Sequence, residues 1–180
     1  MLPSGNDAAV TLAENVGTHM YLSSYEYKVK KRQPFYDDSR DEKLLNPEKL
    51  FYEEMNKFAE KIGMENTVYA NPHGLANTEN FSCALDQAKI SLFAMNDKLF
   101  REVVKTKTYT GLVERDHKEC DVTWENTNKL LDRGYKGIKT GITSVAGPCL
   151  SSYFENDRIG IICIVLGCKV LADRFNDCDS

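Results

Sequence analysis

Apolar side chains recur at helical spacing in the first half of the chain. Between residues 47 and 62 they return every three or four positions, with Pro47 suited to the first helical position and Gly63 to the end. The same spacing predicts a helix over residues 84–95, followed by a short one over 98–104. These segments are expected to pack one face against a core.

A further helix is predicted at the beginning of the chain. Ser4 is a good N-cap residue, and Asp7 three positions later forms a carboxylate variant of the capping box. Good helix formers follow as far as Gly17, which is expected to end the helix.

The last third of the chain alternates short apolar runs with turn residues. Strands are predicted over residues 106–110, 135–141, 149–154 and 158–166, the last two joined by a tight turn at 155–157. Residues 159–166 are apolar on both alternating faces, so both sides of this sheet should be covered. The fold class is therefore α/β (α+β), an antiparallel sheet with helices on both faces.

No apolar period continues through residues 28–43, where a basic cluster is followed by acidic residues. We interpret this stretch as part of an exposed insertion or mobile loop at about residues 18–47. A chain of 180 residues with 42% apolar residues is long enough for one compact domain and short for two. A single domain over residues 1–180 is expected.

Charge and cysteine usage exclude several functions. A net charge of −4 with mixed signs gives no nucleic-acid footprint, and no apolar stretch is long enough for a membrane span. The first residues lack the features of a secretion signal. The six cysteines show no C-x-x-C and no ligand spacing with histidine, so no metal site is expected. Cys163 is interpreted as a buried small hydrophobe, and the disulfide state stays open.

Two short motifs carry the candidate chemistry, Ser4-Gly5-Asn6 and Lys139-Thr140-Gly141. The first opens a predicted helix and the second ends a predicted strand. A lysine ammonium beside a serine hydroxyl makes an electropositive patch for a carboxylate, and the Thr140 hydroxyl can donate to the same carboxylate. Gly141 lets a ligand approach the backbone. Function thus depends on Ser4 and Lys139 facing one cleft.

These motifs match two of the three that build the active site of penicillin-interacting serine enzymes, whose third motif is S-x-x-K. No serine in this chain is followed by lysine three positions later. Either the sequence belongs to a longer protein that supplies the nucleophile, or it is a relative that cannot acylate.

The chain resembles the low-molecular-mass penicillin-binding D-Ala-D-Ala carboxypeptidases, of the β-lactamase and transpeptidase-like superfamily. The resemblance rests on segments in family order: 2–9, 55–67, 71–75, 127–131, 137–141 and 146–147. It implies that the sequence is incomplete at its N-terminus, with S-x-x-K about 60 residues upstream of Ser4, and that Met1 is an internal methionine. At the other end, residues 174–177 resemble the start of a C-terminal helix.

The resemblance also implies roles for particular residues. Ser4 would relay protons and Asn6 would orient the substrate amide and the catalytic lysine. Lys139 and Thr140 would hold the terminal carboxylate beside Gly141, and the backbone amide of Ile142 would form half of the oxyanion hole. The implied reaction is acyl transfer from a peptidoglycan stem peptide ending in D-Ala-D-Ala, which β-lactams mimic, without cofactor or metal. An extracytoplasmic or secreted parent is expected; the localisation of this chain itself stays open.

Two alternatives remain beside this enzyme. One is a non-catalytic relative that binds a peptide or muropeptide carboxylate. The other is a class A-like β-lactamase, because residues 40–46 fit R-x-E-x-x-L-N, with Glu42 as base and Asn46 as partner of the deacylating water. His73 could act as a base, a common role of histidine, but a structural turn is the better interpretation of its segment.

Overall fold

The computed structural model describes residues 1–180, which divide into two compact units. One unit comprises Asn6–Ser82, and the other comprises Met1–Gly5 together with Cys83–Ser180. None of the helices is both long and apolar enough to cross a bilayer.

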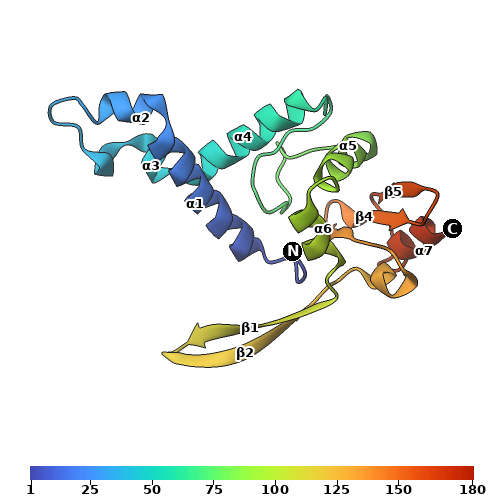
Figure 1. The fold of residues 1–180 in the computed structure, drawn as a ribbon. Helices are drawn as coiled ribbons and strands as arrows, with labels where there is room; N and C mark the ends of the chain where they lie inside the picture. Colours follow the sequence, from blue (N-terminus) through green and yellow to red (C-terminus); the bar gives the residue numbers. More distant parts are fainter. The chain divides into compact units, whose positions relative to one another are not determined.

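The unit formed by Asn6–Ser82 is mainly helical (Figure 1). Helix α4 carries Pro47 at its first position and the Asn46 side chain as its N-cap, which confirms the predicted helix. Beyond α4, a single bridge pairs Val68 with Phe81. The elements are α1 (Asn6–Ser23), α2 (Tyr25–Lys30), η1 (Asp38–Arg40), α3 (Glu42–Leu45) and α4 (Pro47–Lys61).

Helix α1 is longer than predicted, because Gly17 does not end it. Gly17 is buried in the middle of the helix, where α1 packs against α4. A Cβ at this position would lie 2.0 Å from the carbonyl oxygen of Pro47. The glycine therefore permits a close approach between two helices. Ser4 is not the cap, since it lies two residues before the first residue of α1.

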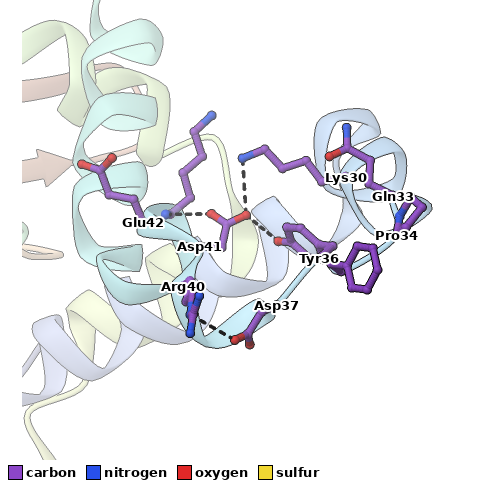
Figure 2. A pocket seen from close by; sticks show the side chains of 10 residues that line it. Lys30, Gln33, Pro34, Tyr36, Asp37, Arg40, Asp41 and Glu42 are labelled. Atoms are coloured by element: carbon purple, nitrogen blue, oxygen red, sulfur yellow. Dashed lines mark hydrogen bonds and ion pairs between the residues drawn. The ribbon is translucent and has the colours of Figure 1, made fainter.

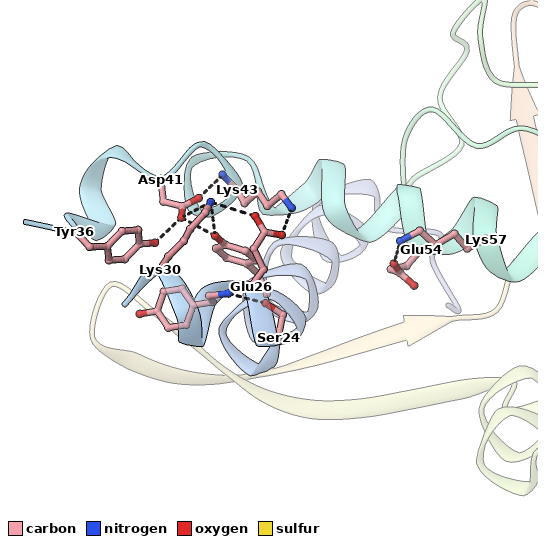
Figure 3. Close-up of polar contacts among 10 residues, drawn as sticks. Ser24, Glu26, Lys30, Tyr36, Asp41, Lys43, Glu54 and Lys57 are labelled. Carbon is pink, nitrogen blue, oxygen red and sulfur yellow. Dashed lines mark hydrogen bonds and ion pairs between the residues drawn. The ribbon is translucent and has the colours of Figure 1, made fainter. Parts of the chain in front are cut away.

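Most of residues 28–43 are exposed, as expected, but the prediction that the whole segment is a loop is wrong. The segment forms α2, η1 and α3 around Asp41, which is 6% exposed (Figure 3). The hydroxyls of Tyr21 and Tyr36 donate to Asp41 Oδ2 at 2.6 and 2.5 Å, and the Lys43 backbone N–H donates to Oδ1 at 3.0 Å. The Lys30 ammonium lies 3.4 Å from Oδ2. A polar centre thus takes the place of an apolar core.

The second unit contains a three-stranded antiparallel sheet in the order β3-β4-β5, which confirms the predicted meander. Its strands are β3 (Ile138–Thr143), β4 (Gly147–Glu155) and β5 (Gly160–Val165). Helix α5 (Ala84–Ala94) meets the face of Ser151, whose hydroxyl lies 2.8 Å from that of Ser91. Helix α7 (Asp173–Asp179) meets the opposite face, where Leu150 packs with Leu130 and Phe175.

Helices therefore lie on both faces of the sheet, as predicted. Coverage of β5 is incomplete, because Ile161 is 49% exposed. Two further elements precede β3 along the chain. They are the predicted helix α6 (Lys98–Lys105) and the 3₁₀ helix η2 (Lys129–Arg133).

A separate two-stranded hairpin pairs β1 (Thr108–Arg115) with β2 (Lys118–Glu125). Only the beginning of β1 was predicted. Asp116 and His117 form the two-residue turn, and both have positive φ, as a type I′ turn requires. The sequence signal for this turn is weak, because glycine or asparagine normally occupies such positions.

We expect Gly17→Ala to destabilise the helical unit. The added methyl would meet the Pro47 carbonyl, a backbone atom that cannot turn aside. Overpacking of this kind typically costs about 1–3 kcal/mol, and the better helix propensity of alanine offsets part of it. Urea unfolding followed by far-UV circular dichroism measures the effect. His19→Ala, at an exposed position of α1, is the control, and equal midpoints for the two variants would contradict this packing.

We expect Asp41→Asn to destabilise the same unit by on the order of 1–3 kcal/mol. An amide has only one accepting oxygen, so it cannot accept the two tyrosine hydroxyls on one side and the Lys43 N–H on the other, as the carboxylate does. Burial alone would raise the pKa of Asp41, but hydrogen bonds from Tyr21, Tyr36 and the Lys43 amide together lower it below its usual range. The contribution of this carboxylate to stability is therefore complete above the pKa of an unfolded Asp and is lost as the pH falls toward the folded value.

Asp37→Asn is the matched control for this experiment. Asp37 and Asp41 both cap short helices through Oδ1, a task that asparagine performs equally well. Only Asp41 is buried, so only its variant should lower the urea midpoint at neutral pH and flatten the acid dependence. A similar loss in both variants would show that capping, and not the buried carboxylate, matters.

Candidate active site

The N-terminal segment 1–5 is attached to the sheet unit through Thr127. The Thr127 backbone N–H donates to the carbonyl of Leu2 at 3.4 Å, and the Leu2 side chain is buried. The Ser4 N–H donates to the Met1 carbonyl at 3.2 Å, closing a tight turn in which Ser4 has a φ of 60°. This turn holds Ser4 in an exposed position.

Strand β3 presents the K-T-G motif opposite β4. Lys139 pairs with Ser151, Thr140 with Leu150 and Gly141 with Cys149. Successive side chains of a strand point to opposite faces, so Lys139 and Thr140 lie on different sides of the sheet.

Lys139 and Ser4 are in direct contact. The Lys139 ammonium donates to Ser4 Oγ at 2.5 Å and also to the Thr140 carbonyl oxygen. The proximity of these two residues, expected from the motifs alone, is therefore confirmed, although 135 positions separate them. Burial, with a smaller contribution from the charge of Arg174, lowers the pKa of Lys139 below its ordinary value.

Thr140 is in a different situation, because it is buried and its hydroxyl lies 2.5 Å from that of Thr127. The Thr127 hydroxyl is also placed to donate to the Leu2 carbonyl, at 3.5 Å. When the Thr127 hydroxyl donates to the Leu2 carbonyl, its only proton is used in that bond. The Thr140 hydroxyl must then be the donor in its bond with Thr127. Thr140 would then have to turn away from Thr127 to reach a ligand.

Arg174 of α7 is a site residue that the motifs did not reveal. It is 6% exposed, and its Nη1 donates to the carbonyl oxygens of Gly141 at 2.9 Å and of Cys149 at 3.4 Å. Its buried Nε has no hydrogen-bond partner. In the sequence it appeared only as part of a C-terminal helix, and no local pattern marks an arginine that will be buried behind a strand.

The surface above Gly141 is open. A Cβ built on this glycine would have no atom within 4 Å. The next residue, Ile142, lies opposite Pro148 and its side chain is 62% exposed. Ser4, Lys139 and Gly141 thus form a cationic, accessible strip along β3. The predicted role of the Ile142 amide in an oxyanion hole stays a prediction.

Asn6 belongs to the helical unit, where it is the exposed first residue of α1. Its predicted role in orienting substrate stays a prediction.

The arrangement around Glu42 does not fit a deacylating base. Glu42 is exposed at the start of α3, beside an open hollow of about 520 Å³ (Figure 2). The side chain of Asn46 is engaged as the N-cap of α4, where it accepts from the Lys49 N–H at 3.3 Å. The two residues therefore have ordinary structural environments, which removes the support for a β-lactamase loop.

His73 takes part in a local turn, as interpreted from the sequence. Its Nδ1 accepts from the Leu75 N–H at 3.1 Å, and the neighbouring Asn71 bonds both Gly74 and Leu75. Gly74 has a φ of 80°, which suits a glycine.

Comparison with known proteins identifies the family. The family model of D-alanyl-D-alanine carboxypeptidases matches residues 43–170. A D-alanyl-D-alanine carboxypeptidase of Streptomyces sp. strain K15 is 34% identical over 98% of this chain and 55% of its own length. The carboxypeptidase DacF of Bacillus subtilis strain 168 is 29% identical over 96% of this chain and 37% of its own. The chain thus spans about half or less of the length of these relatives.

A crystal structure of the Streptomyces K15 DD-transpeptidase is similar in fold, with a TM-score of 0.76 and 32% identity, covering 98% of this chain and 61% of that one. The family model covers well over half of the residues and includes the K-T-G strand. The chain belongs to the D-alanyl-D-alanine carboxypeptidase family.

Proposed function

We propose that these residues provide the carboxylate-binding part of the active site of a serine-type D-Ala-D-Ala carboxypeptidase. The observation that carries the proposal is the 2.5 Å contact between Lys139 Nζ and Ser4 Oγ, next to the open backbone of Gly141. The proposed substrate is a peptidoglycan stem peptide with a terminal D-alanine, and β-lactams would bind as its mimics.

The charges at the site support an anionic ligand. Lys139 and Arg174 both lie near Gly141, and neither forms an ion pair with an Asp or Glu. A partly buried ammonium without a counter-charge is unfavourable, and a substrate carboxylate would supply that charge. Arg174 would attract the anion through its positive charge and not through a direct bond from Nη1, because Nη1 already donates to backbone carbonyls.

Ser4 would take part in proton transfer in this scheme. Its hydroxyl accepts from Lys139, so its own proton is free to be donated to a leaving amine. Acyl transfer further requires a nucleophilic serine, and in the S-x-x-K motif a lysine three residues later accompanies it. No serine of these 180 residues meets that requirement. Acylation therefore depends on a segment outside this sequence.

The lack of an S-x-x-K serine among these residues favours one alternative function. A non-catalytic relative would keep the cationic strip and bind a peptide or muropeptide carboxylate without cleaving it. The two proposals differ in whether the encoded protein contains an S-x-x-K upstream of Ser4. The reading frame before Met1 decides between them.

We expect no covalent labelling of these 180 residues by a fluorescent penicillin. The β-lactam ring needs an activated serine to open, and Ser4 has no lysine three positions later that could activate it. Denaturing electrophoresis after incubation measures the label, with the Streptomyces K15 enzyme as positive control. A labelled band that disappears in Ser4→Ala would show that Ser4 itself is a nucleophile.

We expect the chain to bind an acylated peptide ending in D-Ala-D-Ala more tightly than the same peptide with a C-terminal amide. Loss of one charge-assisted bond in Lys139→Ala should weaken binding about tenfold. Calorimetric titration measures the affinity. Lys118→Ala, at an exposed position of the separate β1-β2 hairpin, is the control. Equal affinity for acid and amide, or no effect of Lys139→Ala, would contradict carboxylate binding.

The same titration should depend on pH at the alkaline end. Because the pKa of Lys139 is lowered, its ammonium is lost at a lower pH than that of an exposed lysine. Affinity should therefore fall as the pH rises toward the ordinary lysine value. Lys139→Arg keeps its charge through this range and should keep its affinity. A pH profile shared by both proteins would assign the effect to another group.

A further inference from the structure

Two cysteines from different elements lie on the α7 face of the sheet. Cys163 is in β5 and pairs with Ser152 of β4, and Cys178 is in the last turn of α7. Cys178 packs on the core cluster formed by Leu130, Leu150 and Phe175. Leu150 and Ser152 share a strand face, so Cys163 points toward the same helix.

The two thiols are neighbours on this face, because α7 packs directly on β5. Both the Cys163 thiol and the Ser152 hydroxyl lie near enough to influence the pKa of Cys178. The backbone at Cys178 is fixed by the Tyr135 hydroxyl, which donates to the Cys178 carbonyl at 2.9 Å. Cys163, interpreted from the sequence as a buried small hydrophobe, is half-buried.

We propose that Cys163 and Cys178 form a disulfide that ties α7 to β5. Both are free thiols in this structure. Helix α7 packs directly on β5, the sheet holds the backbone of Cys163 and the Tyr135 hydroxyl holds that of Cys178. This is the kind of placement that a disulfide between the two elements requires. A small disulfide such as oxidised glutathione is the oxidant.

The exchange balances in two steps. The thiolate of one cysteine attacks a sulfur of oxidised glutathione, which forms a mixed disulfide and releases one glutathione thiolate. The thiolate of the other cysteine then attacks the protein sulfur and displaces the second glutathione. The two cysteines together lose two protons and two electrons, and one oxidised glutathione becomes two reduced molecules.

Burial raises the pKa of the Cys178 thiol to about 12. Little thiolate forms there at neutral pH, so the exchange should be slow in the folded chain and faster while α7 is undocked. The same burial should protect the bond from reduction once it has formed.

The bond would bear on the neighbouring site through α7. Arg174, one turn before Cys178, donates to the Gly141 carbonyl and lies behind the K-T-G strand. Tying α7 to β5 would hold Arg174 in place when the end of the helix loosens. The bond itself does not depend on the proposed substrate, so its test is separate from that of carboxylate binding.

The test is refolding of the chain from urea with reduced and oxidised glutathione, followed by alkylation in denaturant, digestion and mass spectrometry. We expect a linked peptide pair containing Cys163 and Cys178, which dithiothreitol abolishes. Cys178→Ser should remove it, and Cys120→Ser, on the separate hairpin, should leave it. The thermal midpoint of the wild type should be several degrees higher oxidised than reduced, without such a shift in Cys178→Ser.

Three outcomes would overturn the proposal. Full alkylation of both cysteines after oxidation is one. Linkage of either cysteine to a different one, such as Cys149 or Cys168, is another. The third is a link found only between chains. If Cys178→Ser fails to fold, Cys163→Ala provides the same comparison from the strand side.

Discussion

The candidate site depends on one hydrogen bond, from the Lys139 ammonium to the Ser4 hydroxyl. It joins the first turn of the chain to a strand near its other end, so neither motif can form the site alone. The bond is made possible by Thr127, which holds the Leu2 carbonyl on one side and contacts the Thr140 hydroxyl on the other. These short polar contacts thus bring Ser4 and the distant K-T-G strand into one surface.

The electrostatics of this surface follow from where its cations lie. Lys139 is half-buried and Arg174 is almost fully buried, and no carboxylate of the chain pairs with either. Burial, and to a smaller extent the nearby positive charge of Arg174, lowers the pKa of Lys139. The site therefore holds a cation whose charge is least costly when an anion is bound. This physical constraint favours carboxylate binding independently of any likeness to other proteins.

The sequence predicted those elements that apolar spacing defines. The helix beginning at Pro47, the helix beginning at Ala84 and the β3-β4-β5 meander lie where expected, with boundaries shifted by a few residues. The helical turns within residues 28–43 were missed because this segment folds around Asp41, whose partners are hydroxyl, amide and ammonium groups. Likewise, the site pair of Ser4 and Lys139 was found from its motifs, whereas burial of Arg174 depends on tertiary packing that no local pattern records.

The backbone conformation of Ser4 raises the question of why a serine, and not a glycine, occupies this position. A φ of 60° is uncommon for a residue with a side chain and costs on the order of 1–3 kcal/mol. A glycine would adopt it more easily, yet it would leave the Lys139 ammonium without the hydroxyl that now accepts its bond. The strain persists because Leu2 fixes the turn: its side chain is buried and its carbonyl accepts from the Thr127 amide. The chain thus keeps an unfavourable backbone geometry at the residue whose hydroxyl accepts a hydrogen bond from the Lys139 ammonium.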